Sequence, residues 1–471
     1  MVLVLTVVVL QFISFANYAL TTKTTNIIYG SAPYLTFDGG RTRVTNTEAL
    51  LGISLSDGRK FTPATSNSRD NPIILPVAGQ SFADIGMLVP TNTNSIALSS
   101  LIGTPYNYWG DDDGDGQGID GITATGSLNV LINNGWGGLV ARNEVLTICS
   151  SPYKLTLSNT EGRLTTRYGV PNESRFNAGN ATYYINPKAA PAVCSITPYP
   201  LRRGNSTNVG EWEEGLSADV FYSSSFRPQS VTPSSYGLNF PTTGANKLYF
   251  DLGIRGVSQA LSWAPVSHEG ITATMTNSTR TGVRVTLTGP VARKSKTNPG
   301  GVNKPSLPQS FELVGRDSSG NAVVKYGFVL KQWFISYYHI NYLTTGIPFA
   351  DVSSWCYRTG YRLPKVRDLT NASSCSRSCG GPYGYDYINE FPGGATPSSP
   401  DKYLRRHIGG GLFSEWGPAY GSSDHVHAYY TSELTNDGTH VFTVFSPDGQ
   451  TNAILRSSTT PGYADFLCTY P

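Results

Sequence analysis

Short runs in which apolar and polar residues alternate, each closed by turn-forming residues, recur along most of the chain. Alternation with a period of two is typical of a β-strand with one buried face. Residues 282–289 (GVRVTLTG) are the clearest case, with Val283, Val285 and Leu287 on one face. Similar runs follow at intervals of about 8 to 12 residues with no helical period between them, which predicts an antiparallel sandwich of immunoglobulin type over residues 201–329.

The N-terminal part carries the same pattern. Residues 126–141 (GSLNVLINNGWGGLVA) alternate before an Asn-Gly pair, and residues 151–170 (SPYKLTLSNTEGRLTTRYGV) alternate before a turn at 159–162. Such turns connect hairpins, so we expect a hairpin at each place. The 471 residues suggest roughly three domains at about 150 residues per domain. Residues 20–200 are therefore predicted to form a β-rich first domain.

A helical pattern interrupts the strands in the last part of the chain, residues 330–471. In IPFADVSSWCYRTG (347–360) the apolar residues recur at spacings of three and four, which predicts a helix that ends at Gly360. Its buried face includes Cys356. A second short helix is expected in RLPKVRDLTNA (362–372), where proline suits the first helical turn. Strand-like runs follow, so we predict an α+β terminal domain in a mainly β chain.

Six cysteines, an even number, fit an oxidising compartment. In GYADFLC (462–468) the last cysteine shares the inward strand face with Phe466, so we predict a disulfide between Cys356 and Cys468. A bridge that closes so long a loop contributes about 4 to 5 kcal/mol in the chain-entropy model. Sequence alone permits other connectivities, but the remaining pairs that we expect are Cys149 with Cys194 and Cys375 with Cys379. The CxxxC spacing of the last pair leaves a zinc site as the alternative.

The first residues are predicted to direct export. Val2–Ile13 is almost continuously apolar, small residues follow, and the first charged residue is Lys23. This pattern predicts a secretory signal peptide over residues 1–19. About 12 apolar residues are too few to span a bilayer core of about 30 Å, so a membrane anchor is the weaker alternative. The net charge is only +3 and no basic stripe is present, which argues against a nucleic-acid partner.

The motifs of residues 330–471 occur in an order that resembles a known family. The helix with Cys356 is followed by GYRLPKVRDLTNA, then EWG, then YYTSE, then a terminal YADFLC. This order resembles the C-type-lectin-like tip domain of the intimin and invasin adhesins of enteric bacteria. The preceding sandwich is similar to the immunoglobulin-like units that lead into such tips, and the part containing ADIGMLVP and WGDDDGDGQGIDG resembles enterobacterial adhesion-domain proteins.

The resemblance implies a secreted or cell-surface bacterial adhesin that binds a host-cell surface protein through its lectin-like tip. The alternative is an exoprotein or effector that leaves the cell through a separate intimin-like outer-membrane barrel and binds a bacterial or host protein. The Glu-Pro-Asn and Trp-Asn-Asp signatures of calcium-dependent lectins are absent, so we expect no calcium-held sugar in the tip. We also expect no enzyme, because neither a Gly-x-Ser-x-Gly elbow nor a phosphate loop is present.

Rigid aromatic side chains gather in the stretch between the second helix and EWG. Such side chains suit protein recognition because they bury a large area with few torsions to freeze. Their alternative role is to pack under their own loop. With two nearby arginines, the candidate partner-binding residues are Tyr383, Tyr385, Tyr387, Phe391, Arg405 and Arg406. Integrin-binding relatives use an acidic loop side chain, and Asp424 is the nearest equivalent here.

An acidic loop, DDDGDG at 111–116, is the candidate metal site. Carboxylates at alternate positions next to glycine resemble the start of a calcium loop. The candidate ligands are Asp111, Asp113, Asp115 and Asp120. The twelfth position is Ile122 rather than the glutamate of an EF-hand, so we expect calcium binding to be weak, with a dissociation constant of about 0.1 to 1 mM. A solvated turn is the alternative, and no cofactor is required.

Overall fold

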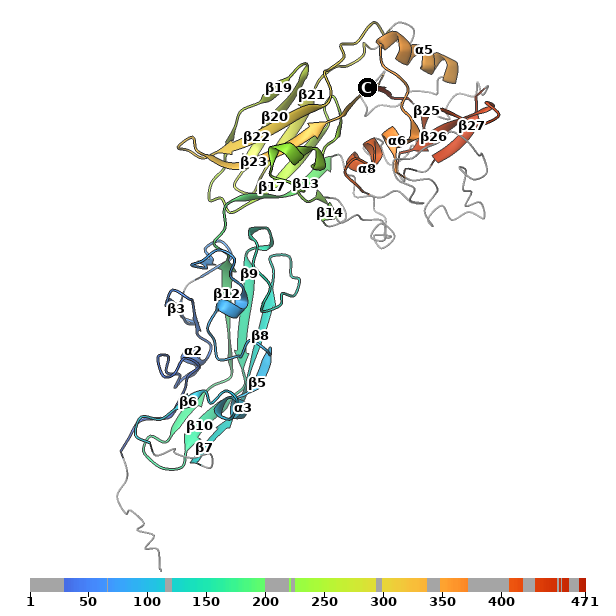
Figure 1. Ribbon diagram of the computed structural model, residues 1–471. Helices are drawn as coiled ribbons and strands as arrows, with labels where there is room; N and C mark the ends of the chain where they lie inside the picture. The colour runs from blue at the N-terminus through green and yellow to red at the C-terminus, as the bar shows by residue number, and fades with distance from the viewer. Residues whose placement is uncertain are drawn as a thin grey trace, which may run out of the picture. The chain divides into compact units, whose positions relative to one another are not determined.

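The computed structural model describes residues 29–65, 67–114, 121–199, 220–221, 225–293, 299–336, 348–371, 406–417, 428–446, 449, 451–456 and 466–471. These residues are mainly β, as predicted, and form two compact units, Met1–Lys188 and Ala189–Pro471 (Figure 1). None of the described helices combines the length and the apolar character needed to cross a membrane. The expected signal peptide over residues 1–19 lies outside the described residues.

The described residues of the first unit form four sheets. The largest has the order β4-β12-β9-β8-β5 and is antiparallel except for the β4–β12 pair. The others have the orders β11-β10-β7, β1-β6 and β2-β3. The strands are β1 (Tyr34–Leu35), β2 (Ile53–Ser54), β3 (Lys60–Phe61), β4 (Ile73–Ile74), β5 (Ser95–Ala97), β6 (Trp109–Gly110), β7 (Ile122–Thr125), β8 (Ser127–Asn133), β9 (Tyr153–Asn159), β10 (Gly162–Thr166), β11 (Glu173–Phe176) and β12 (Gly179–Asn186). The helical turns are α2 (Thr47–Leu50), η1 (Phe82–Asp84), α3 (Leu98–Ile102) and η3 (Ile148–Ser150).

The expected alternation of the first unit is confirmed, but its second hairpin is wrong. Leu128, Val130 and Ile132 of β8 are buried, and so are Leu155 and Leu157 of β9. The strands β9 and β10 do not pair with each other, since β9 pairs with β8 and β12 whereas β10 pairs with β7 and β11. The turn after β9 therefore moves the chain from one sheet to another. The Asn-Gly turn after β8 does reverse the chain, where Val140 N donates to Ile132 O at 3.1 Å.

Two facing glycines explain this change of sheet. Gly126, with φ +98°, separates β7 from β8, and Gly162 begins β10. A Cβ on Gly162 would lie 2.3 Å from the carbonyl oxygen of Thr125, and a Cβ on Gly126 would lie 2.9 Å from the Cα of Gly162. Both chains bend at the same level, where only a residue without a side chain permits so close an approach. The ladder is thereby divided into two sheets.

The second unit begins with a β-sandwich, as predicted. One sheet has seven strands in the order β14-β15-β13-β17-β21-β20-β19, and the other has the order β18-β22-β23. The strands are β13 (Ala192–Tyr199), β14 (Val220–Phe221), β15 (Ser225–Phe226), β17 (Tyr249–Arg255), β18 (Ser262–Trp263), β19 (Val266–His268), β20 (Ile271–Thr279), β21 (Gly282–Thr288), β22 (Gln309–Arg316) and β23 (Ala322–Leu330), with the 3₁₀ segment η5 (Pro233–Leu238). Strand β13 pairs with β17, although the sequence pattern places it in the expected first domain.

The two sheets of the sandwich pack face to face through aromatic side chains. Phe250 of the seven-stranded sheet meets Phe328 of the other sheet edge to face, with ring centroids 5.9 Å apart. Phe328 also stacks on Phe311, at 5.0 Å and an interplanar angle of 7°. Val283 and Val285, which the alternation of β21 assigns to the inner face, are 2% and 0% exposed. The inward face of β21 is thus the one that its sequence predicts.

The chain continues from β23 into a terminal module that consists of β24 to β28 with α5, α6 and α8. Strand β24 joins the order β16-β24-β28, and the other strands have the order β25-β26-β27. Figure 1 shows α8 between the sandwich and the β25–β26–β27 sheet. The elements of the module are β24 (Gln332–Ile335), α5 (Phe349–Thr359), α6 (Val366–Leu369), α8 (Leu412–Trp416), β25 (Ala428–Leu434), β26 (His440–Phe445), β27 (Thr451–Leu455) and β28 (Cys468–Tyr470). Strand β16 (Thr243–Ala245) comes from the sandwich segment of the chain, between η5 and β17, and pairs with β24. One hydrophobic core runs through the sandwich and the terminal module.

Candidate functional site

The terminal module is closed by the predicted disulfide between Cys356 and Cys468. Their Cα atoms are 5.5 Å apart, and both residues are buried. Helix α5 presents Cys356 inward and ends at Gly360, whose φ of +84° is the left-handed cap that the sequence predicts. Strand β28 carries Cys468 opposite Ile335 of β24. The bond therefore ties α5 to a sheet whose middle strand comes directly from the sandwich.

Helix α6 is held by two carboxylates. Asp368 is buried and its Oδ2 accepts hydrogen bonds from the backbone N of Lys365 and from Nη1 of Arg362, both at 2.7 Å. Glu433 of β25 accepts a hydrogen bond from the backbone N of Val366 at 2.6 Å. Carboxylates are favourable at a helix N-terminus because they satisfy free N–H groups. The acidic residues of the RLPKVRDLTNA and YYTSE motifs thus stabilise the module from within.

The EWG motif joins the terminal module to the sandwich. Glu415 of α8 is fully buried, and its carboxylate accepts hydrogen bonds from the backbone N and Oγ1 of Thr242 and of Thr243, at 2.6 to 3.1 Å. The backbone N of Gly409 also donates to it, at 2.8 Å. Trp416 adds a hydrogen bond from Nε1 to the carbonyl oxygen of Thr243 at 3.0 Å. A buried carboxylate with this many donors is satisfied as an anion.

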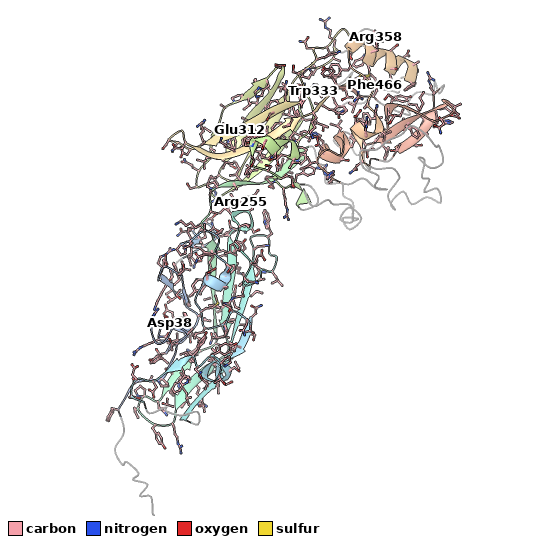
Figure 2. The ribbon with its side chains drawn as sticks, in the orientation of Figure 1. Asp38, Arg255, Glu312, Trp333, Arg358 and Phe466 are labelled. Atoms are coloured by element: carbon pink, nitrogen blue, oxygen red, sulfur yellow. A yellow bond between two sulfur atoms is a disulfide. The ribbon has the colours of Figure 1, made fainter. Side chains whose placement is uncertain are left out.

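Aromatic packing surrounds this junction. The ring of Trp416 lies 4.7 Å from that of Phe240 and 6.2 Å from that of Phe250. On the other side of the module, Trp355 of α5 meets Phe466 at 5.0 Å. Trp333 of β24 is fully buried and donates a hydrogen bond to the carbonyl oxygen of Pro290 at 3.0 Å (Figure 2). The module is therefore packed directly on the sandwich, and its orientation is fixed by this interface.

Arg406, a predicted partner-binding residue, points inward. It is 5% exposed, and its guanidinium carbon lies 5.1 Å from the ring centroid of Phe226. Burial lowers the pKa of Arg406 to about 10, and the nearby negative charge of Glu415 opposes this shift. Arg406 lies just before α8, and it is buried because that helix packs on the sandwich. Arg406 is therefore buried in the described structure, and its contact with a partner stays a prediction.

The other candidate partner-binding residues lie outside the described part of the chain: Tyr383, Tyr385, Tyr387, Phe391, Arg405 and Asp424. Cys375 and Cys379 lie outside it as well, so their disulfide and its zinc alternative stay predictions. Cys149 and Cys194 are both disulfide-bonded, in agreement with an oxidising compartment. Their pairing with each other stays a prediction.

The acidic loop is only partly described. Asp112 pairs with Arg43 and accepts a hydrogen bond from the hydroxyl of Tyr34 at 3.2 Å, and the carboxylate of Asp113 accepts one from the backbone N of Ser31 at 2.6 Å. Burial, followed by this contact with Asp112, raises the pKa of Tyr34. Asp115 and Asp120 lie outside the described residues, and the described residues contain no group of three potential metal ligands. Calcium binding by Asp111, Asp113 and the other two carboxylates stays a prediction.

The junction formed by Glu415 with Thr242 and Thr243 was not predicted from the sequence. Two neighbouring threonines carry no signal by themselves, and they lie 172 and 173 positions before the glutamate. The one available signal was the acidic residue in the first turn of α8 among apolar neighbours, because a glutamate flanked by buried positions needs buried donors.

Comparison with protein-family models and with curated proteins gave no match. Among solved structures, the chain is similar to the C-terminal 282-residue fragment of intimin in complex with the intimin-binding domain of the translocated intimin receptor, with a TM-score of 0.30 and 10% identity over 74% of this chain and 93% of that chain. It is also similar to the Bacteroides ovatus mixed-linkage glucan utilization protein SGBP-B in complex with a mixed-linkage heptasaccharide, with a TM-score of 0.14 and 14% identity over 81% of this chain and 69% of that chain. At these TM-scores neither likeness supports a conclusion about function.

Proposed function

We propose that the chain is a secreted or surface-displayed bacterial adhesin of the intimin and invasin type, which acts by binding and not by catalysis. Its terminal module, a C-type-lectin-like domain in this proposal, binds a host-cell protein. The observation that carries the proposal is the attachment of this module to the sandwich through the buried carboxylate of Glu415. A binding surface that is already fixed in orientation loses less entropy when it meets a partner.

The stretch with the candidate tyrosines begins and ends next to anchored residues. Asn371, just before it, accepts a hydrogen bond from the hydroxyl of Ser414 in α8 at 2.9 Å. Both residues are buried, at 1% and 0% exposure. Asn371 therefore belongs to a fixed part of the module. Its attachment next to the stretch that contains Tyr383, Tyr385 and Tyr387 supports the proposal that these residues recognise a partner.

A protein partner is favoured over a calcium-held sugar in the tip. Glu433 of the YYTSE motif, in the neighbourhood where calcium-dependent lectins hold their sugars, is committed to the backbone of Val366. That hydrogen bond occupies Oε2 of the carboxylate. The buried disulfide of the module supports an oxidising compartment, which secretion or surface display provides.

The test is the binding of the labelled full-length chain to host cells and to protein and glycan arrays, with and without EDTA. Replacement of Tyr383, Tyr385 and Tyr387 by serine is expected to abolish binding to the cells and to the protein arrays. The matched control is Tyr357→Ser, which changes a tyrosine of α5 that is 85% exposed. EDTA is expected to have no effect. Undiminished binding by the triple variant would refute the assigned surface, and turnover of a substrate by the chain would refute the non-catalytic function.

A further inference from the structure

A concave site lies in the first unit, far in sequence from the proposed recognition surface. Its cavity has a volume of about 410 Å³. Phe37, Met87, Val89, Tyr106, Tyr108 and Arg142 are among the residues that line it. Ligand pockets in proteins commonly measure about 300 to 1,000 Å³ and combine apolar walls with a few polar groups. The cavity therefore has the size and the composition of a small-molecule site.

Arg142 is the charged residue of this cavity, and half of its guanidinium is unused. The residue is 7% exposed, and Nη1 donates hydrogen bonds to the carbonyl oxygens of Val89 and Pro90, both at 3.2 Å. Its Nε is buried and has no hydrogen-bond partner. Within the described part of the chain, Arg142 makes no ion pair. A buried charge without a counter-charge is costly, so its retention at a pocket wall calls for an explanation.

The geometry of the guanidinium indicates which ligand it fits. The bonds from Nη1 fix the plane of the group, and Nη2 makes no hydrogen bond within the described part of the chain. A carboxylate that accepts a hydrogen bond from Nη2 forms a charge-assisted bond, which is stronger than a neutral one. The low local polarity around Arg142 strengthens this attraction further.

The aromatic wall is fixed before any ligand arrives. The rings of Tyr106 and Tyr108 lie 5.5 Å apart at 51°, and the hydroxyl of Tyr106 donates a hydrogen bond to Oδ1 of Asn92 at 3.1 Å. Asn107, between the two tyrosines, has a φ of +50°, a conformation that asparagine tolerates. The backbone N of Tyr108 is bonded to the carbonyl oxygen of Leu101 at 2.7 Å. Ordered aromatic side chains suit a flat or ring-shaped ligand.

We propose that this pocket binds a small carboxylate that carries a ring, with the carboxylate hydrogen-bonded to Nη2 of Arg142 and the ring against Tyr106 and Tyr108. Aromatic acids and acidic sugars share this chemistry. The site is independent of the terminal module and adds a small-molecule ligand to the proposed binding function.

The test uses the full-length chain with benzoate, D-glucuronate and N-acetylneuraminate as probes, and benzamide and methyl glucoside as their neutral counterparts. Titration calorimetry and saturation-transfer NMR are expected to detect at least one carboxylate and neither neutral compound. The probe that binds distinguishes an aromatic acid from an acidic sugar. Arg142→Met is expected to weaken binding at least tenfold, whereas Arg163→Met, at an exposed position of β10, is expected to leave it unchanged.

A variant that does not touch Arg142 covers the case in which Arg142→Met fails to fold. Thr91 lines the cavity and is exposed, so Thr91→Trp is expected to fill the cavity from its open side and to abolish binding while the fold is retained. Failure of all three carboxylates to bind at millimolar concentration overturns the proposal. Equal binding of a carboxylate and its neutral counterpart, or full binding by Thr91→Trp, does so as well.

Discussion

Oε2 of Glu415 accepts hydrogen bonds from both the backbone N and the hydroxyl of Thr243, at 2.9 and 2.6 Å, across 172 positions of the chain. The glutamate belongs to α8 of the terminal module, and the threonine opens β16, the strand that pairs in parallel with β24. One fully buried carboxylate thus connects the terminal module to the sandwich segment that carries β16. The terminal module and the sandwich are expected to unfold together, because neither can leave the other without exposing this charge and its donors.

Glu415→Gln is expected to destabilise the second unit by about 3 kcal/mol. The amide can accept hydrogen bonds only through its oxygen, so its NH₂ group would face the donors of Thr242 or Thr243. Arg406 would also lose the buried negative charge nearby. Urea unfolding followed by tryptophan fluorescence measures the change. Asp351→Asn, at an exposed position of α5, is the matched control and is expected to cost less than about 0.5 kcal/mol.

A double-mutant cycle tests whether Arg406 is coupled to Glu415. Arg406→Met removes the buried cation, whose guanidinium nitrogens have no hydrogen-bond partner among the described residues. The double variant is therefore expected to be more stable than the sum of the two single changes predicts, by about 1 kcal/mol. If the two single changes in the free energy of unfolding simply add up in the double variant, the charges of Arg406 and Glu415 are not coupled.

Replacement of Cys356 and Cys468 by serine is expected to lower the free energy of unfolding by about 4 kcal/mol. The bond joins residues 112 positions apart, so its removal frees a long loop in the unfolded chain. Urea unfolding without reductant compares the variant with the wild type, and Trp355, on the same helix as Cys356, serves as the fluorescent probe. An unchanged midpoint would contradict the prediction. As a check, non-reduced peptide maps of the wild type are expected to link these two cysteines.

The sequence predicted the helices and strands of the second unit better than it predicted which segments pack against them. The period-two pattern of β21 and the helical spacing around Cys356 depend on local geometry, so the buried faces of Val283, Val285 and α5 followed directly. The same inward directions at Cys356 and Cys468 were enough to predict their disulfide. Periodicity identifies the face that is buried, but it does not identify what covers that face.

Contacts between distant segments explain what was missed. The inward position of Arg406 depends on the docking of α8 against Phe226, and nothing near residue 406 in the sequence encodes that contact. The hairpin expected after β9 failed for a similar reason, since the turn at 159–162 has ordinary hairpin composition. Its outcome was decided by the close approach of Gly126, between β7 and β8, to Gly162.

Gly162→Ala is expected to destabilise the first unit by about 1 to 3 kcal/mol. The new Cβ would lie 2.3 Å from the carbonyl oxygen of Thr125, a backbone atom that cannot move without breaking the β7–β10 pairing. Gly103→Ala is the matched control, because nothing lies within 4 Å of its Cβ position and its φ is −95°. Calorimetric unfolding of both variants measures the difference. Equal stability of the two would contradict the proposed corner between the sheets.

Glu312 is expected to make the sandwich less stable in acid (Figure 2). The hydrogen bond from the hydroxyl of Tyr236, at 2.7 Å, and then the one from Nζ of Lys325, at 3.0 Å, hold the pKa of Glu312 below its ordinary value of 4.5. A lowered pKa in the folded chain means that the folded state favours the charged form. This contribution to stability is fully present above pH 4.5 and is lost as the pH falls through the lower folded pKa.

Comparison with Glu312→Gln isolates this effect, since both proteins share all other carboxylates. The wild type is expected to be more stable than the variant at pH 6, and the gap is expected to close by pH 3, in urea titrations at both pH values. Burial and the hydrogen bond to Glu312 raise the pKa of Tyr236 to about 12. Tyr236→Phe removes the donor of that hydrogen bond, so in this background Glu312→Gln is expected to cause a smaller loss of stability at pH 6. Glu269→Gln, which removes an exposed carboxylate from the turn between β19 and β20, is the matched control. A stability difference between the wild type and Glu312→Gln that does not change with pH would mean that the bond to Tyr236 does not favour the charged carboxylate.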